Sequence, residues 1–155
     1  MHTLETEDWL PRPIDEVFAF FGDAFNLQRI TPPFLDFKII TPPPITMGVG
    51  TLIDYRIKLR GVPIRWRTRI SAWEPSRRFI DEQLKGPYRT WIHEHTFEPE
   101  SRDGVMGTRC RDLVRYDAPG GSLVHRTLVR PDLERIFEYR QRAMREIMGA
   151  ERQHA

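Results

Sequence analysis

The sequence predicts an α+β fold in which an antiparallel sheet of about seven strands packs against one long helix near the C-terminus. Two observations lead to this prediction. Between residues 50 and 116, apolar and charged residues alternate with a period of two, and short turns rich in Gly and Pro separate the segments. Beyond residue 130, the apolar residues instead recur at the spacing of a helix.

The segment before residue 50 is predicted to hold one strand, two short helices and a second strand. Residues 3–10 form the first strand, and Pro13 begins a helix whose first turn carries Asp15 and Glu16, where the helix dipole favours acids. A second short helix covers residues 24–30 and ends before Pro32. Residues 31–33 and 41–45 are proline-rich connections, and residues 35–40 between them read as a strand.

The central part of the chain is predicted to form the rest of the sheet. Turns are expected at 60–63 and 85–88, and a longer loop, "EPESRDGVMG", at 98–107. The five strands expected here cover residues 51–59, 63–71, 78–84, 86–98 and 108–116. One face of this sheet is predicted to be exposed to solvent, because arginines alternate with the apolar residues that form the other face.

The tail is predicted to be helical. Ser122 suits the start of a short helical turn, and Pro131 suits the start of a long helix. The apolar stripe of that helix comprises Leu133, Ile136, Phe137, Met144, Ile147 and Met148, with Arg and Glu elsewhere. This stripe must be buried, and the inner face of the sheet is the one large surface available for it.

Composition limits the classes of function. The 155 residues suit one domain, 1–155, and the 24 basic residues nearly balance the 22 acidic ones, so no nucleic-acid partner is expected. The single cysteine, Cys110, excludes an internal disulfide and is expected to fill core space. With no signal peptide and no apolar run long enough to span a bilayer, a cytoplasmic protein is predicted. The oligomeric state stays open.

The run "RFIDEQLKGPYRTWIHEHTF", together with "TPPFLDFKI", "GTLIDYRI" and "IFEYR", resembles the bacterial ligand-binding branch of the START/Bet v 1-like (SRPBCC) superfamily. The resemblance extends from about Leu10 to Arg142. It implies a helix-grip fold, in which a curved sheet grips the C-terminal helix around an elongated cavity. The superfamily includes lipid carriers, hormone receptors, polyketide cyclases and oxygenase subunits, so the fold alone does not select an activity.

One strand carries an unusual mixture of side chains. Residues 86–98 place Trp91, His93, His95 and Phe97 on the same face, because side chains alternate across a sheet. Under the resemblance, this face is a wall of the cavity. The predicted ligand-binding residues are Tyr55, Trp66, Thr68, Asp81, Gln83, Trp91, His93, His95, Asp112, Tyr116 and Phe137.

The polar members of this set are predicted to meet across neighbouring strands. If residue 83 pairs with residue 91, Asp81 lies opposite His93, whereas a slip of one residue would turn Ile80 and Glu82 inward instead. If the loop at 98–107 brings Phe97 next to Thr108, His93 also faces Asp112. Charged groups inside a protein must be paired, so these residues are expected to form a network.

Three roles for this network are left open. It fixes the polar end of a small, largely apolar ligand such as a lipid, an isoprenoid or an aromatic molecule, or it is a purely structural network. In the third role, the protein is a cyclase, dehydratase or isomerase in which His93 is a general base oriented by Asp81 or Asp112.

The spacing of His93 and His95 also suits two metal ligands on one strand, with Asp81 or Asp112 as a third. This spacing is common by chance and the resemblance implies no metal, so neither a metal nor another cofactor is expected. The outward arginines at 65, 67, 69, 109, 111 and 115 are expected to form cross-strand ion pairs rather than a nucleic-acid surface.

Overall fold

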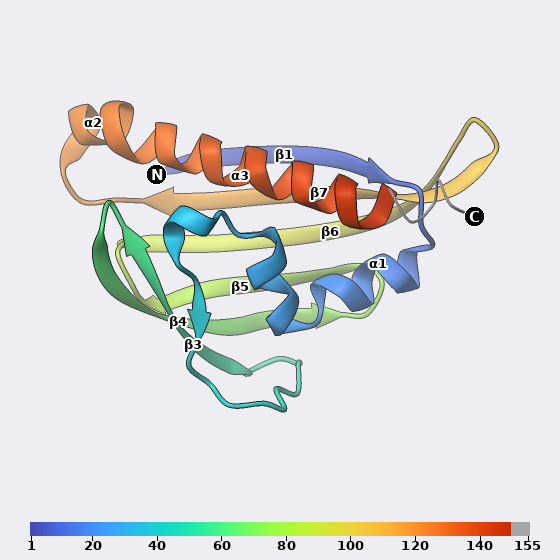
Figure 1. The fold of residues 1–155 in the computed structure, drawn as a ribbon, viewed down its shortest axis with the longest axis horizontal. Helices are drawn as coiled ribbons and strands as arrows, with labels where there is room; N and C mark the ends of the chain where they lie inside the picture. Colours follow the sequence, from blue (N-terminus) through green and yellow to red (C-terminus); the bar gives the residue numbers. More distant parts are fainter. Residues whose placement is uncertain (150–155) are drawn as a thin grey trace.

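The computed structural model describes residues 1–149, so the last six residues of the predicted domain, 150–155, lie outside the described residues. Seven strands form one antiparallel sheet in the order β1-β7-β6-β5-β4-β3-β2. They are β1 (His2–Leu10), β2 (Lys38–Ile39), β3 (Leu52–Leu59), β4 (Val62–Glu74), β5 (Arg78–Lys85), β6 (Thr90–Arg102) and β7 (Val105–Asp117). The predicted helix-grip architecture is therefore confirmed (Figure 1).

A continuous helical run closes one face of the sheet. It comprises α2 (Gly121–Val124), the π-helical turn η3 (His125–Val129), α3 (Arg130–Met144) and a second π-helical turn, η4 (Arg145–Gly149). Figure 1 shows α3 lying lengthwise along the sheet. Its side chains reach β1 through Gln141, which donates to the backbone of Glu7, and β6 through Phe137, whose ring lies 5.5 Å from that of His93.

Three shorter helical segments cover the remaining part of the same face. They are α1 (Ile14–Phe21) and the 3₁₀ segments η1 (Ala24–Ile30) and η2 (Pro33–Leu35). Phe18 of α1 packs edge-on against Phe79 of β5 and Phe97 of β6. Pro13 precedes α1 as its N-cap rather than opening it, a difference within the usual uncertainty of helix ends.

The second predicted strand is shorter than expected. Residues 33–35 form η2, and Asp36 adopts a left-handed conformation with φ of 44°, which leaves only Lys38–Ile39 to pair with β3. Pro33 has the fixed φ that suits the start of the helical turn η2, and the left-handed Asp36 that ends this turn interrupts the extended backbone.

The prediction of a long loop at 98–107 is wrong, because most of these residues belong to the two strands β6 and β7. β6 and β7 continue to Arg102 and from Val105, and Asp103 and Gly104 alone connect them, with φ of 50° and 78°. Two consecutive positive φ values are typical of a type I′ hairpin turn, for which Asp-Gly is a favoured sequence. The tighter turn moves the register by two residues, so Phe97 pairs with Cys110 and not with Thr108.

The C-terminal helix also differs from the prediction, since it begins at Gly121 and runs through Pro131 without a break. A proline inside an α-helix clashes with the carbonyl four residues earlier. Here the preceding turn, His125–Val129, is π-helical, and its wider backbone accommodates the ring.

Four of the six outward arginines, Arg67, Arg69, Arg109 and Arg111, form the predicted cross-strand ion pairs on the solvent-exposed face of the sheet. Arg67 donates to Asp54 at 2.8 Å, Arg69 lies 3.5 Å from Glu82, and Arg111 lies 2.6 Å from Glu5. Within residues 1–149, none of the helices has the length and the apolar character needed to cross a membrane.

Candidate functional site

A cavity of about 160 Å³ lies between the sheet, the C-terminal helix and the segments η1 and η2. Eight of the eleven predicted ligand-binding residues line it: Tyr55, Trp66, Thr68, Asp81, Trp91, His93, His95 and Phe137. The alternating pattern of β3 to β6 brings these side chains to one face of the sheet. Phe137 reaches the cavity from α3.

Three predicted residues do not line the cavity. Gln83 instead holds the turn after β5, since its amide donates to the carbonyl of Tyr88 at 2.7 Å and accepts from the N–H of Tyr88 at 3.1 Å. Tyr116 is fully buried, and its hydroxyl accepts from Arg130 and lies 2.8 Å from Nε2 of His125. Asp112 lies behind the two cavity histidines and acts on the cavity through them.

The wall of the cavity is mainly aromatic. Tyr55 stacks on Trp66 with ring centroids 5.7 Å apart, and Trp66 meets Trp91 edge-on at 5.5 Å. The Tyr55 hydroxyl lies 3.3 Å from the Thr68 hydroxyl, and burial raises the pKa of Tyr55, so this phenol stays protonated. This end of the cavity is therefore mainly apolar, and its polar atoms include the hydroxyls of Tyr55 and Thr68 and the indole N–H of Trp66.

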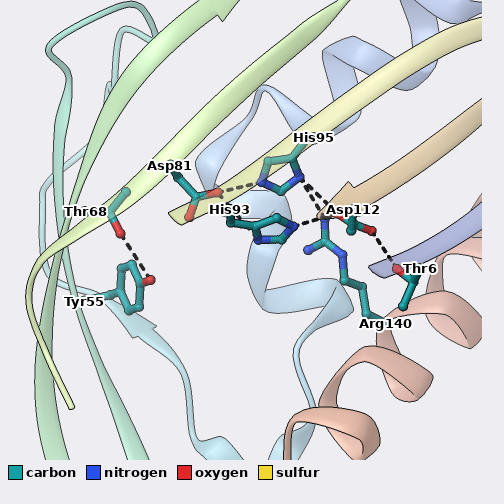
Figure 2. A network of polar contacts seen from close by, with 8 residues as sticks. All are labelled: Thr6, Tyr55, Thr68, Asp81, His93, His95, Asp112 and Arg140. Atoms are coloured by element: carbon teal, nitrogen blue, oxygen red, sulfur yellow. Dashed lines mark hydrogen bonds and ion pairs between the residues drawn. The ribbon is translucent and has the colours of Figure 1, made fainter. Parts of the chain in front are cut away.

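The opposite end is a polar network of Asp81, His93, His95, Asp112 and Arg140 (Figure 2). The predicted register that sets Asp81 against His93 is confirmed. On the other side, His95 rather than His93 pairs directly with Asp112 in the sheet. The two-residue shift leaves every side chain on its predicted face, because the side-chain period of a strand is also two.

Each carboxylate in the network contacts both histidines. Asp112 Oδ1 lies 2.7 Å from Nε2 of His93 and 3.2 Å from Nδ1 of His95. Asp81 Oδ2 lies 2.6 Å from Nε2 of His95 and 3.8 Å from Nδ1 of His93. The two imidazole rings stack between the carboxylates, with centroids 3.7 Å apart.

These contacts indicate different protonation states for the two rings. Carboxylates only accept hydrogen bonds, so His95 donates from Nε2 to Asp81. Its Nδ1 lies 3.2 Å from Asp112, closer than the 3.4 Å to the NH2 of Arg140, so the ring is placed to donate from both nitrogens and to carry a positive charge. His93 donates from Nε2 to Asp112, while its Nδ1 is too far from Asp81 for a hydrogen bond. His93 therefore fits a neutral ring with an Nδ1 lone pair.

The pKa shifts agree with this assignment. Burial lowers the pKa of both imidazoles. For His95, however, the hydrogen bonds to Asp112 and Asp81 outweigh burial and raise the pKa. For His93, burial and the charge of His95 prevail and lower the pKa.

Arg140 lines the cavity and belongs to the polar network, although the sequence did not lead us to predict it there. Its side chain is buried, and its NH2 lies 3.4 Å from Oδ1 of Asp112, whose other oxygen, Oδ2, accepts from Thr6 at 3.3 Å. Burial raises the pKa of Asp112, but Arg140, His93 and His95 outweigh it and hold that pKa well below its usual value. The network thus contains two anions, Asp81 and Asp112, and two cations, His95 and Arg140, so its charges balance.

The spacing of the helix could have revealed Arg140. Leu133, Phe137, Arg140 and Met144 follow one another at intervals of three or four residues, so Arg140 lies within the buried stripe. A buried arginine is normally paired with an acidic residue. Its partner here, Asp112, was already among the residues of the sheet predicted to face inward.

Residues 10–145 match a protein family described as "Polyketide cyclase / dehydrase and lipid transport". Among solved structures, the fold is similar to TTHA0849 from Thermus thermophilus, with 18% identity, a TM-score of 0.69 and coverage of 96% of this chain and 98% of that one. CV1439 from Chromobacterium violaceum gives 14% identity, a TM-score of 0.73 and coverage of 96% and 98%.

A third similar structure, Ara h 8.0201, has 20% identity, a TM-score of 0.60 and coverage of 92% of this chain and 97% of that one. Together with the family match, it confirms the predicted START/Bet v 1-like superfamily. No curated protein matches the sequence.

Proposed function

We propose that this chain, which belongs to the polyketide cyclase/dehydrase and lipid transport family, binds a small and largely apolar molecule with its polar end at the His93 side of the cavity. The observation that carries the proposal is the division of one cavity into an aromatic wall and a charge-balanced polar network. An apolar pocket with a few convergent polar groups is what small-molecule sites require.

Two unpartnered donors refine the class of ligand. Within residues 1–149, the Nε1 of Trp66 and the Nε of Arg140 are buried side-chain atoms without a hydrogen-bond partner in the protein. Both residues line the cavity. Leaving a buried donor unpaired costs about 1–3 kcal/mol, so a ligand that brings acceptor oxygens gains this energy back. These donors support a ligand with carbonyl, phenol or similar oxygens over a pure hydrocarbon.

The volume narrows the choice further. A cavity of about 160 Å³ is close in size to the ~150 Å³ cavity that holds benzene in an engineered protein. One or two rings, or a short isoprenoid, suit this volume without rearrangement. A long-chain lipid would require the segments η1 and η2 or the C-terminal helix to move. The volume favours a small ligand, and together with the two unpartnered donors it favours one that carries oxygen atoms on one or two rings.

The experiment is isothermal titration calorimetry with 2-naphthol and 2-methylnaphthalene, in buffer containing a chelator. Both probes have the same ring system, but only 2-naphthol can hydrogen-bond. The wild-type protein is expected to bind 2-naphthol roughly tenfold more tightly, which corresponds to about 1.4 kcal/mol. The variant Trp66→Phe, which keeps a ring but removes the donor, tests whether this indole contributes to the difference.

Variants of the wall and of the polar end complete the test. Trp91→Ala is expected to weaken the binding of both probes. His93→Ala is expected to weaken mainly the binding of 2-naphthol. Trp9→Phe is the matched control, because the Trp9 indole donates to the carbonyl of Glu100 and does not line the cavity. If Trp91→Ala and His93→Ala bind both probes as the wild type does, the assignment of the site is wrong.

A second candidate function is catalysis with His93 as general base. The observation in its favour is that Asp112 fixes the Nε2–H of His93 at 2.7 Å, which leaves Nδ1 of a cavity-lining ring to accept a proton. Asp112 is then the orienting carboxylate, while Asp81 bonds to His95. Molecules that dissociate from freshly purified protein, identified by mass spectrometry, distinguish the two functions. A carrier returns such a molecule unaltered, whereas a catalyst converts it in excess over the protein.

A further inference from the structure

The two histidines each turn one ring nitrogen toward the same carboxylate oxygen. Nε2 of His95 lies 2.6 Å and Nδ1 of His93 lies 3.8 Å from Oδ2 of Asp81. Figure 2 shows Asp81 beside the two imidazole rings. One ligand atom from each of Asp81, His93 and His95 lies within 4.8 Å of the others. From this convergence we propose that Asp81, His93 and His95 bind a divalent transition-metal ion of the Zn²⁺ class, contrary to the expectation from the sequence.

The separations suit such an ion. Two atoms bound to one tetrahedral zinc at about 2.0–2.2 Å lie about 3.4 Å apart. The separations of 2.6 and 3.8 Å fall on either side of that value. Binding an ion therefore requires the Asp81 oxygen to move about 0.8 Å away from His95 and about 0.4 Å closer to His93. Two imidazoles and one carboxylate match the ligand set of catalytic zinc sites, which leave a further position open.

The opposite nitrogens of both rings provide an independent argument. Nε2 of His93 and Nδ1 of His95 both face Oδ1 of Asp112, at 2.7 and 3.2 Å. A metal-binding histidine usually donates its other N–H to a carboxylate, which fixes the ring and makes it a better ligand. Asp112 is placed to do this for both rings at once.

Asp112 is itself held in place. Its Oδ2 accepts from Thr6, and the NH2 of Arg140 lies 3.4 Å both from its Oδ1 and from Nδ1 of His95. The charge of Arg140 thus lies on the Asp112 side of the histidines, away from the nitrogens that face Asp81. The strands add rigidity, since Asp81 pairs directly with His93 in the sheet and the side chains of β5 and β6 at this point are buried or half-buried.

Charge indicates which ligand the open position would take. A metal ligand needs a free lone pair, so both imidazoles are neutral when they bind the ion. The charges that remain are those of Asp81, Asp112, Arg140 and the divalent ion. The site then carries one excess positive charge, which an anionic oxygen such as a phenolate, a carboxylate or hydroxide would neutralise. Three of the five residues of the polar network would thus hold the ion and the other two would support it.

The test uses the metal alone. Purified protein without an affinity tag is treated with chelator, dialysed, and titrated with Co²⁺, which reports tetrahedral coordination by its visible absorption, and then with Zn²⁺ in competition. The expected result is one ion per chain by elemental analysis, with tetrahedral Co²⁺ bands that Zn²⁺ abolishes. His93→Ala and Asp81→Ala are expected to abolish the bands, and Asp112→Asn to weaken binding by about 10–100-fold.

His125→Ala is the matched control, because His125 stacks on His2 outside the cavity. Each variant is checked for folding by circular dichroism before titration. The proposal is overturned if the folded wild-type protein retains no ion, or if His93→Ala and His125→Ala bind Co²⁺ equally well. A metal site goes beyond the ligand binding proposed above. Binding of the aromatic probes is measured in chelator and binding of Co²⁺ without any organic ligand, so either proposal can fail while the other holds.

Discussion

Replacing Arg140 by methionine tests whether the polar network is held together by charge balance. The side chain is 7% exposed, and its NH2 lies 3.4 Å from Asp112. Methionine keeps an unbranched, helix-compatible chain but leaves two carboxylates with a single imidazolium. At an effective dielectric constant of about 20, the lost attraction to Asp112 is about 5 kcal/mol. This agrees with the roughly 3–5 kcal/mol measured when one partner of a buried pair is removed.

The assay is urea and thermal unfolding at pH 7 in the presence of a chelator. A loss of this size lowers the melting temperature by roughly 6–20 °C for a chain of this length. Arg142→Met is the control on the same helix, since Arg142 is exposed and its substitution is expected to change stability by less than about 0.5 kcal/mol. The double variant Arg140→Met/Asp112→Asn restores neutrality and is expected to be less destabilised than the sum of the single variants, by at least about 1 kcal/mol.

The reasoning is refuted if Arg140→Met is as stable as Arg142→Met, or if the two substitutions in the network are additive. The first result would mean that the guanidinium contributes no net stability. The second would mean that Arg140 and Asp112 do not interact.

Two further predictions concern the histidines and the hairpin turn. In NMR titrations of metal-free protein, His95 is expected to titrate above the ordinary imidazole pKa and His93 below it, as burial and the carboxylates dictate; the reverse order would contradict the assigned protonation states. The raised pKa of His95 stabilises the fold below about pH 6.5, and this contribution is lost as pH rises through the folded-state pKa. Gly104→Ala is expected to cost about 1–2 kcal/mol in urea unfolding, because its φ of 78° is strained for alanine. Gly48→Ala, where φ is not positive and the space is open, should be nearly neutral, and equal effects of the two substitutions would argue against the type I′ turn.

The sheet could be predicted from the sequence because its pattern is local. In β3 and β4, Tyr55, Trp66 and Thr68 alternate with charged residues, so their faces follow from the period alone. The hairpin between β6 and β7 was misjudged because Pro99 and the surrounding charges suggested a loop. The Asp103-Gly104 pair was the stronger signal, since it specifies a turn geometry rather than a composition.

The candidate site was predictable in part for a related reason. His93, His95 and Asp112 lie on alternating strand positions, and an error of two residues in register left them facing the same way. The burial of Arg140 was not predicted because a charged residue on a helix is normally expected to face solvent. Its burial is favourable because of its partners on the strands of the sheet, which the helix sequence does not reveal. The volume of the cavity depends on how the rings of different elements pack, which no local pattern encodes.

The pairing of β1 with β7 has a consequence for synthesis of the chain. Thr6 and Asp112, which share a hydrogen bond, are 106 residues apart. At about 5–20 residues per second, a ribosome needs roughly 5–20 seconds to make the intervening chain. For that time β1 has no partner strand, and its Glu5, Glu7 and Asp8 supply the charge that discourages pairing with other chains. Glu5 later pairs with Arg111 of β7 and Asp8 with Arg145 of the C-terminal helical run, so these side chains charge the strand before it pairs and hold it in place afterwards.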